Sequence, residues 1–229
     1  MSIYEELISN KCAWCRKHKI ENAEHIDIKW RDQKNKGCWP KPYQESGVDL
    51  DKIKAMVIGQ DPTIEDPRPI EYALEANVKE SNLGKFLREV FSTLPSIRFN
   101  ELYFTNLVKC RFDEKPGKKN RCISQFIDKM ASECYSKFLR YEIKECKNAK
   151  YIFTLGRDNF AVLAKLLRVS HLTLAKFKKF YGTPLEIPTT VQDRARYLVP
   201  LPHQPTYDLA EKYSPYRKEE VRGKLERLM

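Results

Sequence analysis

Short apolar segments alternate with amphipathic segments along most of the chain. The apolar segments have the length and composition of buried strands, and they are residues 55–58, 102–108, 151–155 and 197–202. Helices are predicted for residues 1–11, 85–91, 124–146, 159–167 and 216–229. Strands that alternate with helices predict the α/β class, here a three-layer αβα sandwich around a central four-stranded parallel sheet.

The first fifty residues differ in character from the rest of the chain. Residues 16–50 are polar, basic and irregular, so we interpret residues 1–50 as an ordered arm and residues 51–229 as the core of one domain, 1–229. The first ten residues carry acids and lack the apolar centre of a signal peptide. No apolar segment approaches the roughly 20 residues that span a bilayer. We therefore expect a cytoplasmic protein with no membrane partner. We also expect a monomer.

A rigid loop follows the first predicted strand. Gly59 permits unusual backbone angles and the close approach of a ligand. Pro62 fixes its own backbone and keeps Asp61 out of the helical region. In α/β sheets, ligands bind at the carboxyl ends of the strands. Asp61 is therefore a candidate site residue, and a turn aspartate that caps the next segment is the alternative.

Two further polar residues follow predicted strands. Asn106 lies near the end of the second strand, and His203 follows the fourth. Because parallel strands share one carboxyl edge, these two side chains and Asp61 are expected to converge on one pocket. A structural role for each is the alternative: a hydrogen-bonded buried histidine, and an asparagine that binds loop backbone.

The charge balance indicates a polyanionic partner. Lys and Arg total 42 against 31 Asp and Glu, a formal net charge of +11. Such an excess favours nucleic acid. The basic runs 115–121 and 176–179 are candidates for phosphate contacts. Their alternative role is a solvated surface.

The cysteines indicate a metal site. There are seven in a chain without a secretion signal, which argues against a disulfide framework. Cys12 and Cys15 form a C-x-x-C pair, whose two thiolates can chelate one centre. One alternative is a small structural zinc knuckle in which Cys38 or His25 joins this pair.

The polar motifs, taken in order, resemble the uracil-DNA glycosylase superfamily over roughly residues 50–210. They are GQDP at 59–62, TNLVKC at 105–110, TLG at 154–156 and HQP at 203–205. The cysteines resemble the iron–sulfur branch of that superfamily. This resemblance implies a [4Fe–4S] cluster, and zinc is the alternative metal. Cys134 is the implied fourth ligand, and Cys122 is the alternative at that position. The implied ligands are Cys12, Cys15, Cys110 and Cys134.

The resemblance also implies a chemistry. A damaged nucleotide, flipped out of duplex DNA or taken from a single strand, enters a pocket where its N-glycosidic bond is hydrolysed. Asp61 would orient or deprotonate water, and His203 would donate a hydrogen bond to a carbonyl of the leaving base. Asn106 would bind the Watson–Crick edge. The other implied substrate contacts are Gly59, Gln60, Pro62, Thr63 and Tyr72.

The chain departs from the family pattern at several positions. It has the Gln-Asp-Pro form of the classical branch where the iron–sulfur branch usually has Gly-Glu-Ala-Pro-Gly. Thr63 stands where the classical branch has the tyrosine that excludes thymine. No phenylalanine lies in residues 72–77, where the family stacks the base, and Tyr72 is the candidate substitute. A nucleic-acid-binding protein of this fold with weak or no activity is the alternative function.

Overall fold

The structure of the chain is a computed structural model. It describes residues 49–60, 72–76, 78–79, 81–92, 94, 96–109, 130–169, 180–188, 194–202 and 223–227. Nearly all of the predicted arm over residues 1–50 lies outside these ranges. The predicted helix over 216–229 is described only in part, and residues 223–226 are helical there.

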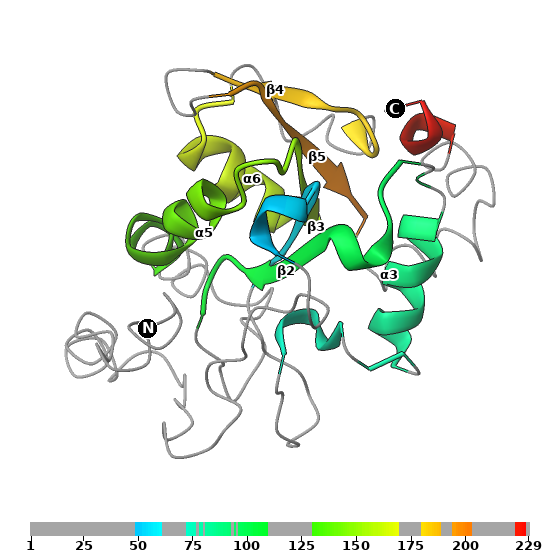
Figure 1. Ribbon diagram of the computed structural model, residues 1–229. Helices are drawn as coiled ribbons and strands as arrows, with labels where there is room; N and C mark the ends of the chain where they lie inside the picture. The colour runs from blue at the N-terminus through cyan, green and yellow to red at the C-terminus, as the bar shows by residue number, and fades with distance from the viewer. Residues whose placement is uncertain are drawn as a thin grey trace, which may run out of the picture.

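A five-stranded sheet forms the centre of the described fold, in the order β2-β1-β3-β5-β4 (Figure 1). Four strands are parallel and lie where the apolar segments predict them: β1 (Ala55–Gly59), β2 (Leu102–Asn106), β3 (Tyr151–Leu155) and β5 (Arg196–Leu201). The α/β class is confirmed, and so is the parallel arrangement of these strands.

The predicted strand number of four is wrong, because a fifth strand lines one edge of the sheet. β4 (Leu185–Ile187) pairs antiparallel with β5. It has three residues and prolines on both sides, Pro184 and Pro188, so it is too short to show an alternating pattern. Glu186 is exposed and Ile187 is buried, as expected for a strand at the edge of a sheet.

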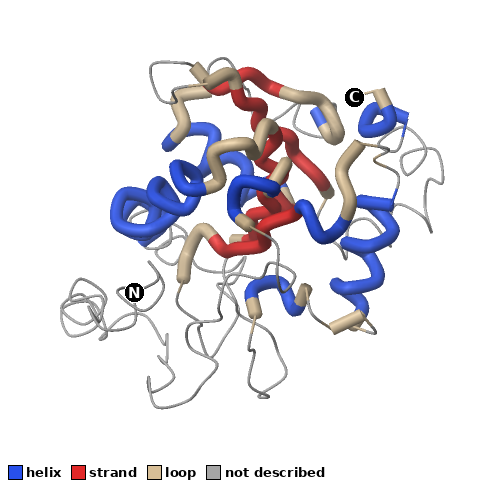
Figure 2. The backbone as a smooth tube through the Cα atoms, in the orientation of Figure 1, coloured by secondary structure: helices blue, strands red, loops and turns tan. Residues whose placement is uncertain are grey.

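Helices cover both faces of the sheet, which confirms the three layers. α3 (Asn82–Ser92) lies on one side, and α5 (Arg140–Glu145) and α6 (Arg157–Leu166) lie on the other (Figures 1 and 2). The helix that leads into β3 is helical from residue 130, and it contains a π-helical stretch, η4 (Tyr135–Leu139), directly before α5. Its predicted first residues, 124–129, lie outside the described ranges.

Aromatic packing fixes the strands against α3. Every residue of β1, β2 and β3 is buried, as central strands covered on both faces require. Phe91 of α3 meets Phe104 of β2 edge to face at 6.4 Å between ring centroids, and Phe153 of β3 at 5.1 Å. The strands pair in parallel, so their carboxyl ends form a single edge.

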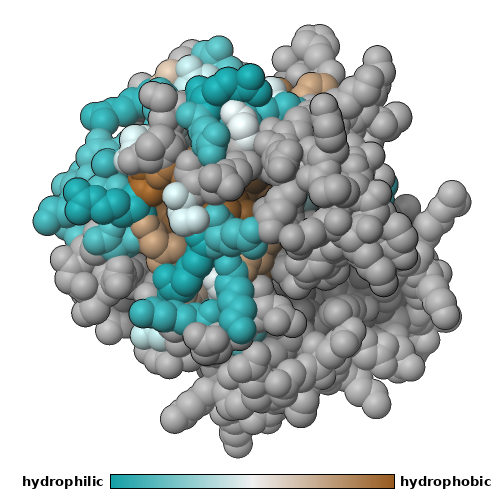
Figure 3. Space-filling model, turned by 90° about the vertical axis from the view of Figure 1, so that its right-hand side faces the viewer, coloured by the Kyte–Doolittle hydropathy of each residue, from teal (hydrophilic) through white to brown (hydrophobic). Residues whose placement is uncertain are grey.

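The described surface on the α3 side is mostly hydrophilic, with a small apolar area near its centre (Figure 3). Among the described residues, Tyr141 is the only large apolar side chain that is exposed. No helix in that part of the chain has the length and apolarity needed to cross a bilayer.

Candidate active site

Asn106 and Gly59 lie side by side at the carboxyl edge of the sheet, as the last residues of β2 and β1. The Asn106 side chain is only 2% exposed, and its Oδ1 atom has no hydrogen-bond partner among the described residues. A buried acceptor left without a partner costs about 1–3 kcal/mol. An acceptor kept in this condition at a strand end is a candidate group for binding a ligand.

Gly59 provides the space that the Asn106 side chain occupies. A Cβ atom at position 59 would lie 2.5 Å from Oδ1 of Asn106, and it would also overlap Cδ2 of Leu74. Any side chain at this position would therefore displace one or both neighbours. The Asn106 carboxamide and Leu74 occupy the space that the missing Cβ leaves, and the close approach of a ligand at Gly59 stays a prediction.

Leu74 is a neighbour that the sequence did not indicate. It lies in a tight turn, η2 (Ala73–Glu75), where Leu74 has φ 58° and Glu75 has φ 48°. The left-handed region costs a non-glycine residue roughly 1–2 kcal/mol. This turn brings the Leu74 side chain against Gly59, beside Asn106. A leucine in such a segment looks like an ordinary core residue, so only the turn geometry identifies it.

Tyr72, the predicted stacking residue, lies two positions before Leu74. It is partly buried and has extended backbone angles at the start of the turn. Its role in binding a base stays a prediction.

Backbone hydrogen bonds extend the pairing of β1 and β2 beyond the strand ends. The N–H of Leu107 donates to the carbonyl of Gly59, and the N–H of Val108 donates to that of Gln60, each at 2.8 Å. Gln60, a predicted substrate contact, is therefore held by Val108. Asp61 is the next residue along the chain.

The neighbouring strands are tied to the same edge. Asn159 of α6 donates from Nδ2 to the carbonyl of Ile58 at 2.6 Å. Gly156, with φ 85°, donates its N–H to the carbonyl of Leu201 at the end of β5. Sequence reasoning did not name Asn159, because its partner is 101 positions away along the chain.

The two predicted catalytic residues lie just beyond the described ranges. Asp61 follows Gln60 after β1, and His203 follows Pro202 after β5. The strands β1 and β5 both flank β3, and strands two positions apart in a sheet are roughly 10 Å apart. The described ends of β1 and β5 thus lie at one edge of the sheet. Pro62 and Thr63 also lie outside the described residues.

A sequence model of the Uracil DNA glycosylase superfamily matches residues 47–219. The chain belongs to this superfamily. A comparison with curated proteins finds no match. The matched region of this superfamily member contains all five strands and every predicted catalytic and substrate-contact position. Residues 1–46, including Cys12 and Cys15, lie outside the match, so the iron–sulfur branch stays a prediction.

Only one predicted cluster ligand lies in the described part of this glycosylase-superfamily chain. Cys134 is 1% exposed and directly precedes the π-helical stretch η4. The other predicted ligands and the rival Cys122 lie outside it. Among the described residues, no group of three or more His, Cys, Asp or Glu side chains is arranged to hold a metal ion.

Cys146, the other cysteine in the described part of the chain, is also buried. Burial, together with the nearby Glu142 carboxylate, raises the pKa of the Cys146 thiol well above its usual range. A thiol held in its neutral form is a poor metal ligand, because metals bind the thiolate. The predicted ligand set, which omits Cys146, stays a prediction.

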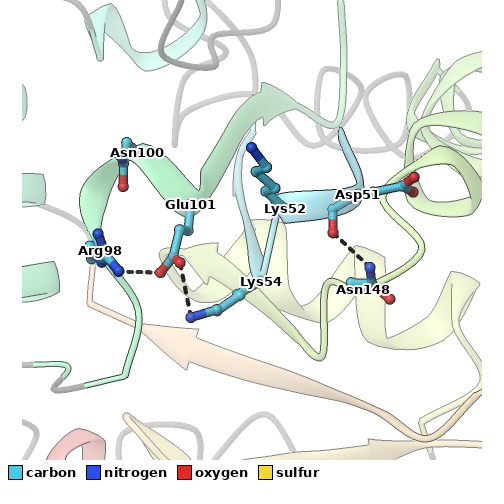
Figure 4. A pocket seen from close by; sticks show the side chains of 7 residues that line it. All are labelled: Asp51, Lys52, Lys54, Arg98, Asn100, Glu101 and Asn148. Carbon is cyan, nitrogen blue, oxygen red and sulfur yellow. Dashed lines mark hydrogen bonds and ion pairs between the residues drawn. The ribbon is translucent and has the colours of Figure 1, made fainter. Parts of the chain in front are cut away.

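A cavity of about 520 Å³ lies at the opposite, amino edge of the sheet (Figure 4). Two of its charged side chains form an ion pair, in which Lys54 contacts Glu101 at 2.9 Å. Burial alone would raise the pKa of Glu101, but hydrogen bonds from the Arg98 N–H and from Lys54 lower it. Asn148 donates to the carbonyl of Asp51 at 2.6 Å. We assign no chemistry to this cavity.

Proposed function

We propose that the protein is a DNA glycosylase that hydrolyses the N-glycosidic bond of uracil or another damaged base in DNA, as in base excision repair. The observation that carries this proposal is the buried Asn106 carboxamide. It lies at the carboxyl edge beside Gly59, with an acceptor left open, in a chain of the uracil-DNA glycosylase superfamily.

Recognition would use both ends of the Asn106 carboxamide. An amide offers a carbonyl acceptor and an NH₂ donor. Uracil presents an N3–H donor beside the O4 acceptor on its Watson–Crick edge, so one amide can bind both atoms. The base must first leave the stack, which costs a few kcal/mol and costs least for damaged or single-stranded bases. Leu74, beside Asn106, would supply an apolar wall for the base ring.

Hydrolysis replaces the bond from C1′ of deoxyribose to the base nitrogen with a bond from C1′ to a water oxygen. The electron pair of the broken bond stays on the base, which leaves as an anion, and the sugar carries positive charge in the transition state. Asp61 would accept the proton from water and offset that charge. General-base help of this kind is typically worth about 10²–10⁴ in rate. The products are a free base and an abasic deoxyribose.

His203 would stabilise the leaving base by donating a hydrogen bond to its carbonyl oxygen. One preorganised donor of this kind is worth about 3–4 kcal/mol. Its placement directly after Pro202, at the end of β5, supports this role because β5 ends at the same edge as β1.

A [4Fe–4S] cluster held by Cys12, Cys15, Cys110 and Cys134 is part of the proposal. Burial of Cys134 fits a thiolate-only centre shielded from solvent. Glycosidic hydrolysis transfers no electrons, so the cluster would be structural. It would join the amino-terminal arm to the segment after β2. Zinc, bound by the same thiolates or with a histidine, is the alternative.

The direction of α5 supports the pairing of Cys110 with Cys134. This helix ends near the amino edge, where Asn148 contacts Asp51. Cys134 precedes Glu142 by eight helical residues, or roughly 12 Å. Cys134 therefore lies toward the carboxyl edge. Lys109, which directly precedes Cys110 in the sequence, follows β2 at the same edge.

The direct test is an excision assay with labelled oligonucleotides that contain a single uracil, as duplex and as single strand. The wild-type protein should release the base and leave an alkali-labile abasic site. Asp61→Asn and His203→Ala should each reduce the single-turnover rate at least about a hundredfold, with DNA affinity nearly unchanged. DNA binding without release of any tested base would favour the non-catalytic alternative.

A further inference from the structure

A buried ion pair lies behind the pocket, on the other face of the sheet. Glu142 of α5 is 4% exposed and Lys109 is 8% exposed. Lys109 Nζ donates to both carboxylate oxygens of Glu142 at 2.7 Å and to Oγ1 of Thr105 at 2.6 Å. All three ammonium donors are therefore used. The Thr105 hydroxyl in turn donates to Oε2 of Glu142 at 3.0 Å.

A buried ion pair is weak evidence for stability, because removing two charges from water offsets most of their attraction. Its best-attested use is to fix one arrangement of the chain against others. The position of this pair shows which arrangement is fixed here.

Glu142 holds the chain on both sides of the pocket residues. Thr105 and Lys109 are four positions apart, and both bind the same carboxylate. The residues between them include Asn106, the proposed base-binding side chain, and the two residues whose N–H groups hold Gly59 and Gln60. Adjacent strand residues point to opposite faces, so Thr105 can bind α5 while Asn106 faces Gly59.

We infer that Glu142, acting through Lys109 and Thr105, positions the pocket for base excision. This clamp, formed by Glu142, Lys109 and Thr105, holds the chain on both sides of Asn106. Through the N–H groups of Leu107 and Val108, it also holds Gly59 and Gln60, the two residues that precede Asp61. These are positioning residues, since none of the three faces the base, and the inference rests on the proposed function. Misplacing reacting groups by about 1 Å can reduce a rate on the order of a hundredfold.

The test compares Thr105→Val and Glu142→Gln with Glu101→Gln. Thr105→Val keeps the side-chain shape and loses only the hydroxyl, so it provides a result even if Glu142→Gln does not fold. Glu101→Gln breaks the Lys54–Glu101 pair, which joins the residues just before β1 and β2 at the amino edge of the sheet. For each variant the measurements are single-turnover excision at saturating DNA, DNA Kd, thermal stability, and amide hydrogen exchange at Leu107 and Val108.

The clamp variants should lose at least about tenfold in excision rate while Kd stays within about twofold. Exchange at Leu107 and Val108 should accelerate more than exchange in α3. Glu101→Gln should change neither quantity. A rate that falls only in proportion to the folded fraction, or wild-type rate and exchange in both clamp variants, would overturn the inference.

Failure of the proposed function gives a different result. If the wild-type protein excises no base, hydrogen exchange alone decides. Faster exchange at Leu107 and Val108 in Thr105→Val then upholds the clamp on the pocket backbone, and unchanged exchange rejects it.

Discussion

Gly59 is the residue whose size matters most at the carboxyl edge. Its missing side chain leaves room for the Asn106 carboxamide and for Leu74. Those two neighbours are the proposed base-binding group and the proposed apolar wall of the pocket. A change of one methyl group at this position therefore reports on the pocket itself.

Gly59→Ala should reduce excision at least about tenfold, because the new methyl displaces Asn106 or Leu74. The free energy of unfolding should fall by only about 1–3 kcal/mol, as for other overpacked positions. Gly223→Ala is the matched control, since nothing lies within 4 Å of a Cβ added there. Its helical position predicts a gain of about 0.5–1 kcal/mol and no change in excision. Urea unfolding and single-turnover assays measure both, and equal excision rates in the two variants would refute the pocket geometry.

Residues with a distinctive chemistry at a strand end could be predicted from the sequence. Gly59 and Asn106 follow apolar segments, and the structure brings them together in register. Leu74 could not be predicted, because its place depends on two consecutive left-handed residues in a turn with no glycine. Glu142 could not be predicted either, since its partner Lys109 is 33 positions away and their contact depends on how α5 crosses the sheet.

At the scale of elements, the local pattern of apolar residues was sufficient to predict the central strands. The buried strands are apolar throughout because helices cover both of their faces, and that pattern is visible in the sequence. β4 is too short for a pattern, and the π-helical turn η4 has no sequence signature. π-helical turns are frequent at functional sites, and this one begins directly after Cys134.

Cys134 and Cys146 provide a matched test of the proposed cluster, because both thiols are buried near the same helix. Cys134→Ser should lose bound iron and sulfide, since it removes one of four thiolate ligands. Cys146→Ser should keep both, because its high pKa leaves that thiol protonated. Iron and sulfide analysis of protein purified without oxygen provides the measurement. Stoichiometric zinc in the wild-type protein, or iron loss in both variants, would reject the cluster.

At the scale of the whole molecule, the two edges of the sheet differ in the segments of the chain that they lead into. The amino edge holds the Lys54–Glu101 ion pair and the cavity of Figure 4. The carboxyl edge holds an open carboxamide acceptor and leads into both predicted catalytic positions. The net charge of +11 adds a long-range attraction for a polyanion to this arrangement.

DNA binding should therefore weaken steeply with salt, because each phosphate contact releases counterions. The logarithm of the affinity of Asp61→Asn, which should bind without excising, should fall linearly with the logarithm of KCl concentration. The expected slope is about −0.9 for each phosphate neutralised in duplex DNA. Fluorescence anisotropy between about 50 and 200 mM KCl measures it. A flat dependence would show that the basic residues form a solvated surface only.

The most direct test of the account compares two asparagines, each with a buried carboxamide oxygen that has no partner among the described residues. Asn106 lies at the carboxyl edge beside Gly59, and Asn100 lies at the amino edge in the cavity of Figure 4. Single-turnover excision of uracil is measured for Asn106→Ala and Asn100→Ala, with DNA affinity measured in parallel. The account predicts a loss of at least about a hundredfold for Asn106→Ala with nearly unchanged affinity, and a wild-type rate for Asn100→Ala. Wild-type excision by Asn106→Ala, or equal losses in both variants, would contradict it.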